Sequence, residues 1–139
     1  MTSSAALTPK SGSDIALDTN QAVALLNGSG AIGTWVAAFS TIYLPVPVIG
    51  ELYFGAENSK RVGENRARVA KLLTRTVALP LSEHTAEVYA RTRAELKRLG
   101  RPIPSNDLWI AAVCLEHDLA LATLDAHFAV VPGLKVTHP

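Results

Sequence analysis

Four acidic residues are placed so that folding could bring their carboxylates into one cleft: Asp18, Glu51, Asp107 and Asp125. Hard divalent cations such as Mg²⁺ and Mn²⁺ prefer carboxylate and water oxygens as ligands. Two such ions about 3.5–4 Å apart can activate a water molecule and stabilise the leaving oxygen in phosphodiester cleavage. The four acids therefore predict a divalent metal site.

Three of the four acids also have a purely structural interpretation. Asp18 carries the strongest signal, because it ends the apolar run 15–17, and ligands bind at the carboxyl edge of open α/β sheets. Asp107 and Glu51 are expected in the first turns of helices, where the helix dipole favours a carboxylate whether or not it binds metal. Asp125 could be an ordinary turn residue. The local sequence leaves these alternatives open.

The elements that must position the acids alternate between strands and helices. Apolar runs predict strands at residues 14–17, 41–44, 76–79, 119–123 and 134–137. Helical patterns cover residues 21–27, 31–39, 48–57, 61–74, 82–99 and 105–117. This alternation predicts an α/β fold, a three-layer α/β/α sandwich around a central, mostly parallel sheet of four to five strands.

Local signals refine two of these helices. Pro45 and Pro47 exclude a central strand at that point, and Pro47 suits the first turn of the next helix. Ser105 or Asn106 is expected to cap the helix at 105–117. That helix is apolar almost all round, which predicts a buried central helix.

Length and composition favour one compact unit. The chain has 139 residues with 48% hydrophobic content, which predicts a single domain at 14–138. The first residues are mostly small and polar, with Pro9 and Lys10, which predicts a flexible N-terminal tail at 1–13. A mean hydropathy of +0.20 suggests apolar surface covered by a partner or a second copy. One cysteine allows no intramolecular disulfide. We expect a cytoplasmic protein, because no signal peptide or membrane-spanning run is present.

The charge balance gives no general case for nucleic-acid binding. The formal net charge is +1, so contact with phosphates would need a local basic patch. The helices at 61–74 and 82–99 carry such basic side chains, although an ordinary solvated face explains them as well. The four histidines are scattered without the spacing of a metal site.

Four short motifs, taken in order, resemble those of PIN-domain nucleases. They are Leu17-Asp18-Thr19-Asn20, Gly50-Glu51-Leu52, Ser105-Asn106-Asp107-Leu108 and Thr123-Leu124-Asp125-Ala126. The resemblance extends from Ile15 to Val136 and is greatest to the VapC-type toxins of bacterial toxin–antitoxin pairs. No single motif is specific to PIN-domain nucleases, but the four motifs in this order are.

The resemblance implies an Mg²⁺- or Mn²⁺-dependent endoribonuclease that cuts RNA, often structured RNA such as tRNA. Such proteins are usually homodimers, and a cognate antitoxin inhibits them by covering the acidic cleft. The match of motifs assigns metal binding and catalysis to Asp18, Glu51, Asp107 and Asp125. Thr19, Asn20 and Thr123 match polar positions that support such a site by hydrogen bonding.

Two other functions remain open. An inactive PIN-like module could bind RNA or protein, although four intact acids argue against a lost site. The segment from Gly28 to Gly33 spells the G-x-G-x-x-G motif of dinucleotide-binding domains. However, the expected strand lies earlier, at 15–17, so a glycine-rich turn between two short helices is the better interpretation.

Overall fold

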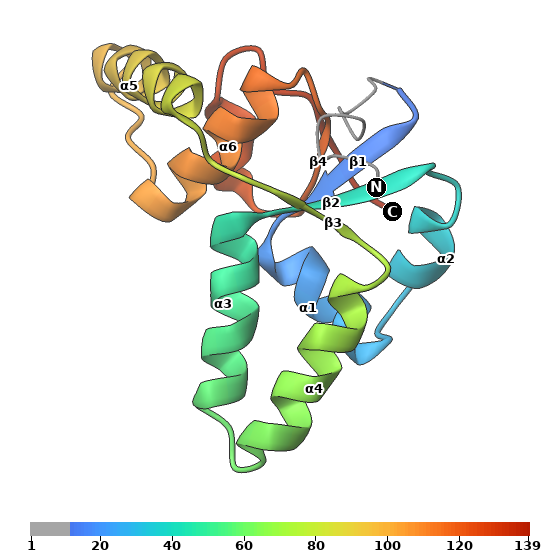
Figure 1. The fold of residues 1–139 in the computed structure, drawn as a ribbon. Helices are drawn as coiled ribbons and strands as arrows, with labels where there is room; N and C mark the ends of the chain where they lie inside the picture. The colour runs from blue at the N-terminus through green and yellow to red at the C-terminus, as the bar shows by residue number, and fades with distance from the viewer. Residues whose placement is uncertain (1–11) are drawn as a thin grey trace.

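A computed structural model describes residues 12–139, and the predicted tail at 1–13 lies almost wholly outside this range. Five parallel strands form one sheet in the order β3-β2-β1-β4-β5. The strands are β1 (Asp14–Leu17), β2 (Thr41–Pro45), β3 (Val77–Leu79), β4 (Leu121–Ala122) and β5 (Val136–Thr137). The predicted parallel sheet is confirmed (Figure 1).

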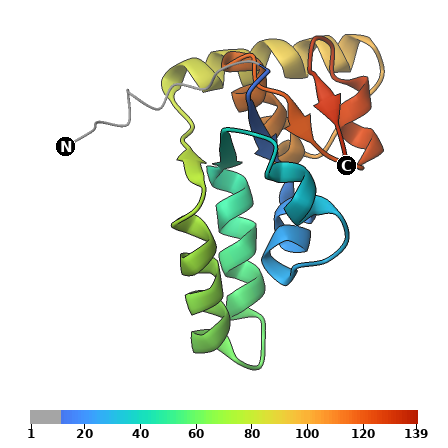
Figure 2. The same cartoon turned by 90° about the vertical axis from the view of Figure 1, so that its right-hand side faces the viewer.

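Helices cover both faces of the sheet. They are α1 (Thr19–Asn27), α2 (Ile32–Val36), α3 (Val46–Glu57), α4 (Val62–Leu73), α5 (Glu83–Arg98), α6 (Ser105–Glu116) and the short 3₁₀ helix η2 (Ala126–Val130). The helices α1, α3 and α4 lie on one side and α5 and α6 on the other, and α3 and α4 extend away from the sheet side by side (Figures 1 and 2). This arrangement confirms the three-layer sandwich.

The core is centred on β1, which lies between β2 and β4. Ile15, Ala16 and Leu17 have no exposed surface, which explains why the strand reads as an unbroken apolar run. Helix α6 buries all residues from 110 to 114, so the predicted buried central helix is confirmed. Among the described residues, no helix is both long enough and apolar enough to span a membrane.

Two predictions about proline-rich turns are wrong. The strand β2 is an inner strand, and Pro45 is its last residue, paired with Leu79 of β3. Proline fits there because its missing N–H falls where the ladder ends. The residue that directly precedes α6 is Pro104, and no side chain caps this helix. Pro104 has φ −56° and ψ 144°, so helical geometry begins directly at Ser105.

The predicted elements at 119–123 and 31–39 are shorter in the structure. Asp118 adopts a left-handed conformation with φ 51°, and the amide of Leu119 bonds to the carbonyl of Cys114 at 2.9 Å. Leu119 therefore completes the turn that ends α6, and β4 begins only at Leu121. Helix α2 ends at Val36, before the predicted boundary.

Helices α5 and α6 are joined by hydrogen bonds at one end. Ser82 caps α5, as predicted, and forms a capping box with Thr85. The Thr85 hydroxyl also donates to Oε1 of Glu116 in the last turn of α6. This contact fixes the two helices that cover the same face of the sheet.

Candidate metal centre

Asp18 lies where β1 ends and α1 begins. Its side chain is 3% exposed, and Oδ1 accepts a hydrogen bond of 2.9 Å from the Gln21 amide, which caps α1. Oδ2 accepts a hydrogen bond from the hydroxyl of Thr123. Both oxygens of this carboxylate are therefore held in a defined orientation at the carboxyl edge of the sheet.

Asp125 follows β4, the strand next to β1. Its backbone amide donates to the Thr123 hydroxyl oxygen at 3.0 Å, so one threonine links the Asp18 and Asp125 segments. Asp125 Oδ1 accepts a bond of 2.9 Å from the His127 amide and caps η2. The turn interpretation of Asp125 is thus correct at the level of local structure, and it leaves the carboxylate able to bind a ligand, because each carboxylate oxygen has more than one acceptor site.

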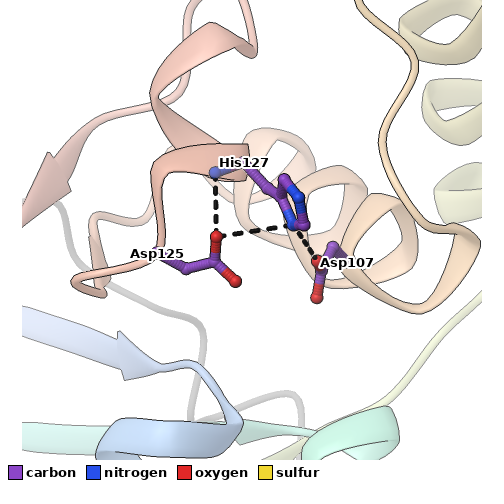
Figure 3. A group of neighbouring side chains, drawn as sticks. All are labelled: Asp107, Asp125 and His127. Carbon is purple, nitrogen blue, oxygen red and sulfur yellow. Dashed lines mark hydrogen bonds and ion pairs between the residues drawn. The ribbon is translucent and has the colours of Figure 1, made fainter.

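Asp107 lies in the first turn of α6. It does not cap this helix, and its Oδ2 lies 3.1 Å from Nδ1 of His127. The same ring nitrogen lies 3.4 Å from Oδ1 of Asp125. Figure 3 shows the imidazole pointing toward both carboxylates, so this histidine joins α6 to the turn after β4.

Glu51 lies on α3, in its second turn and not its first. The helix begins at Val46, two residues earlier than predicted, because proline is tolerated within the first turn and Pro47 does not have to open it. Glu51 is exposed, as a solvated helical glutamate would be. Its side chain nevertheless faces the same pocket as the other acids.

The structure brings all four predicted acids to one open pocket of about 240 Å³. The lining residues are Asp18, Thr19, Asn20, Glu51, Asn106, Asp107, Asp125 and Phe128. These residues come from four segments that are far apart in the sequence. A pocket lined by carboxylates from four separate segments is suited to a hard cation, since such ions take several oxygen ligands at once.

Burial and charge act together on Asp18. Burial raises its pKa above the ordinary value, and the charges of Asp125 and Asp107 raise it further. Hydrogen bonds from Thr123 and Gln21 lower the pKa but do not cancel the effect of burial. A buried carboxylate beside two others lacks a counter-charge, and a bound divalent cation would supply one.

His127 is the site residue that sequence reasoning missed. No metal-type spacing links the four histidines in the sequence, yet a ring nitrogen of His127 and one carboxylate oxygen each of Asp107 and Asp125 lie within 4.8 Å of one another. The available signal was its position, two residues after Asp125 in a predicted turn. Asn106 and Phe128 also line the pocket. Asn106 directly precedes the predicted acid Asp107, and Phe128 directly follows His127.

Two other candidate features do not contribute. Burial raises the pKa of the Cys114 thiol to about 12, so this side chain is no nucleophile at neutral pH. Gly28 ends helix α1 with φ 66°, and Gly33 lies within α2. The G-x-G-x-x-G segment therefore follows a helix and not a strand, which is the glycine-rich turn expected from the sequence and not a dinucleotide-binding arrangement.

The fold and the site define a class of protein: a parallel α/β/α sandwich that gathers carboxylates at the carboxyl edge of its sheet. The family model of the PIN domain matches residues 15–134. The chain therefore belongs to the PIN-domain family.

Known relatives in sequence include two bacterial proteins. Ribonuclease VapC4 of Mycobacterium tuberculosis is 29% identical over 93 residues, which are 66% of this chain and 72% of the relative. Toxin FitB of Neisseria gonorrhoeae is 29% identical over 104 residues, which are 70% of this chain and 75% of that protein.

Solved structures of the same fold include VapBC complexes. A chain of VapBC2 from Rickettsia felis, crystallised with a DNA fragment from the promoter, superposes with a TM-score of 0.83 and 26% identity. The match covers 91% of this chain and 98% of that chain. A chain of DNA-bound VapBC from Salmonella typhimurium gives a TM-score of 0.84 and 26% identity, covering 90% of this chain and 97% of the other.

Proposed function

We propose that this chain is a metal-dependent endoribonuclease, the toxin of a toxin–antitoxin pair, acting in the cytoplasm. The observation that carries the proposal is the convergence of Asp18, Glu51, Asp107 and Asp125 on one pocket. Membership of the PIN-domain family supports it, as do relatives named as a ribonuclease and as a toxin.

Mg²⁺ or Mn²⁺ is the cofactor that these oxygen donors fit. We assign Asp18 and Asp107 as the main ligands, with Asp125 and Glu51 completing the site directly or through water. When bound, the metal lowers the pKa of a water molecule and stabilises the leaving oxygen of the phosphodiester. No histidine is then needed as a general base.

The neighbouring side chains would orient these acids. Thr123 holds Oδ2 of Asp18 and also accepts the amide hydrogen of Asp125, so it keeps two acids in register. Thr19 and Asn20 line the pocket and can hydrogen-bond to metal-bound water or to RNA. The burial of Asp18 excludes water from one wall of the site, which strengthens its interaction with a cation.

The basic side chains differ in their availability to RNA. On α4, Arg66 pairs with Glu57 at 2.9 Å, and Arg68 donates to Asn27 and to the Leu26 carbonyl. On α5, Arg93 donates to the neutral hydroxyl of Tyr89 at 3.3 Å, a contact that does not neutralise its charge. Arg93 and Lys97 line a pocket of about 380 Å³ that also contacts the start of α6, the helix that carries Asp107. We therefore assign the phosphate contacts of the RNA substrate, such as a tRNA, to α5.

An antitoxin and a second copy of the chain are the proposed protein partners. A groove of about 220 Å³ runs between α1, α3 and α4, and Glu51 lines both this groove and the acidic pocket. A partner segment lying in the groove would reach the acids directly. Phe54 on α3 is 63% exposed and Leu124 is 71% exposed, which supports coverage by a partner and a homodimer.

Cleavage of total RNA by the purified protein, freed from any antitoxin, tests the proposal. We expect discrete fragments with Mg²⁺ or Mn²⁺, and none with EDTA or with the Asp18→Asn variant. Circular dichroism shows whether each variant is folded. If the folded protein cuts no RNA with either metal, the endoribonuclease proposal is wrong and an inactive PIN-like binding module becomes the better interpretation.

A further inference from the structure

We propose that His127 is a ligand of the metal, and that its ring nitrogen shifts the preference of the site from Mg²⁺ toward first-row transition-metal ions. The inference rests on the proposed metal site and extends it. It assigns a mixed oxygen and nitrogen donor set where the four acids alone provide only oxygen.

The distances around His127 carry this inference. Its Nδ1 lies 3.1 Å from Oδ2 of Asp107 and 3.4 Å from Oδ1 of Asp125. Neighbouring ligands of an octahedral ion with bonds of about 2.1 Å are roughly 3 Å apart. The nitrogen therefore already lies near ligand-to-ligand separation from one oxygen of each acid, and His127, Asp107 and Asp125 each offer one ligand atom in a group that spans no more than 4.8 Å.

The backbone around His127 directs the ring into the site. The His127 amide is bonded to Oδ1 of Asp125, and the next residue, Phe128, is 1% exposed and anchors η2 in the core. The turn that presents Asp125 thus presents the imidazole with it (Figure 3). The His127 side chain is 52% exposed, so the ring can adjust to an entering ion without unpacking the core.

The chemistry of the ring provides the selectivity. Without metal, Nδ1 faces two carboxylate oxygens, which only accept hydrogen bonds, so it carries the ring proton there. A metal would take the place of that proton, because in the other neutral tautomer, with the proton on Nε2, Nδ1 has a free lone pair. Imidazole nitrogen binds transition-metal ions such as Co²⁺ and Ni²⁺ well, and affinity rises along the series from Mn²⁺. Mg²⁺ prefers oxygen and retains its waters, so it gains little from His127.

Pulsed electron paramagnetic resonance of Mn²⁺ bound to the full chain gives a direct test. We expect the signal of a coordinated ¹⁴N nucleus, converted to the ¹⁵N pattern when histidine is ¹⁵N-labelled, and lost in His127→Ala. The matched control is His84→Ala, because His84 also faces a carboxylate, with Nδ1 3.7 Å from Glu87, but lies on α5. Wild-type protein that binds Mn²⁺ without nitrogen coupling would overturn the inference.

Calorimetric titration measures the selectivity. We expect His127→Ala to weaken Co²⁺ binding by about tenfold or more and Mg²⁺ binding by about twofold or less. An equal loss for both ions would mean that His127 only positions Asp107, and would overturn the inference. If the protein binds no metal at all, both this inference and the proposed function are wrong. If nitrogen coupling is seen but no RNA is cleaved, only the proposed function is wrong.

Discussion

The hydroxyl of Thr123 donates a hydrogen bond to the carboxylate of Asp18, although 105 residues separate them in sequence. Thr123 follows β4 and Asp18 follows β1, and these strands are neighbours in the sheet. The bond therefore closes the site across two adjacent strand ends, and it depends on the parallel pairing of β1 with β4.

Replacing Thr123 with valine tests the importance of this link. Thr123→Val keeps the shape of the side chain but removes the donor to Asp18 and the acceptor for the Asp125 amide. We expect metal affinity to fall by about tenfold and the free energy of unfolding to fall by about 1–3 kcal/mol. Calorimetric titration and urea denaturation measure the two effects.

The control for this variant is Thr92→Val, the same change at a buried threonine on α5. It should leave metal affinity unchanged. If Thr123→Val binds metal as tightly as the wild type, the hydroxyl does not orient the site.

The raised pKa of Asp18 predicts that the metal-free protein loses stability as the pH rises. Because the folded state holds this proton more tightly than the unfolded state, stability falls as pH rises from the ordinary pKa of 3.8 through the raised value. We expect Asp18→Asn to be more stable than the wild type at neutral pH, since asparagine also caps helices and carries no charge to bury.

The measurement is the difference in urea midpoint between the two proteins across a pH series with EDTA present. The advantage of Asp18→Asn should disappear at low pH, where the wild-type carboxyl group is protonated. A difference that stays constant between about pH 4 and pH 8 would show that ionisation of Asp18 is not its cause.

Added metal should reverse this order of stability. A ligand that binds only the folded state at 100 times its Kd stabilises it by about 2.7 kcal/mol. We expect the wild type to gain this stability with Mg²⁺ or Mn²⁺ and to lose it with EDTA, and Asp18→Asn to gain almost none. Thermal unfolding with and without metal gives the comparison, and an equal gain in both proteins would place the ion elsewhere.

Much of the site was predictable because an apolar run followed by an acidic residue marks the end of a buried strand. The run 15–17 is wholly buried, so its apolar pattern and the following Asp18 fixed the boundary of β1 correctly. The same reasoning located Asp125 after β4. Parallel strands place such residues at one edge of the sheet, and the pairing of β1 with β4, which the sequence did not predict, brings them together.

The rest of the site depends on packing between distant segments. The contact of His127 with Asp107 joins η2 to α6, and no local pattern encodes which histidine faces which helix. Pro47 predicts a helix start near Val48 and therefore a first-turn position for Glu51, but a proline is compatible with several positions in the first turn. The sequence restricts such boundaries without deciding between them.

The junction of α5 and α6 offers a test of stability that is independent of the metal. Thr85 is fully buried and donates to Glu116, whose side chain is 10% exposed. Thr85→Val would remove the donor to Oε1 of Glu116, although Ser82 Oγ still donates to Oε2 at 3.2 Å. It would also remove the acceptor of the Ser82 amide. We expect the free energy of unfolding to fall by about 2 kcal/mol in urea denaturation. Thr92→Val on the same helix should lower the free energy of unfolding clearly less. If the two variants lose equal stability, the packing of the threonine methyl group, not its hydroxyl, joins the two helices.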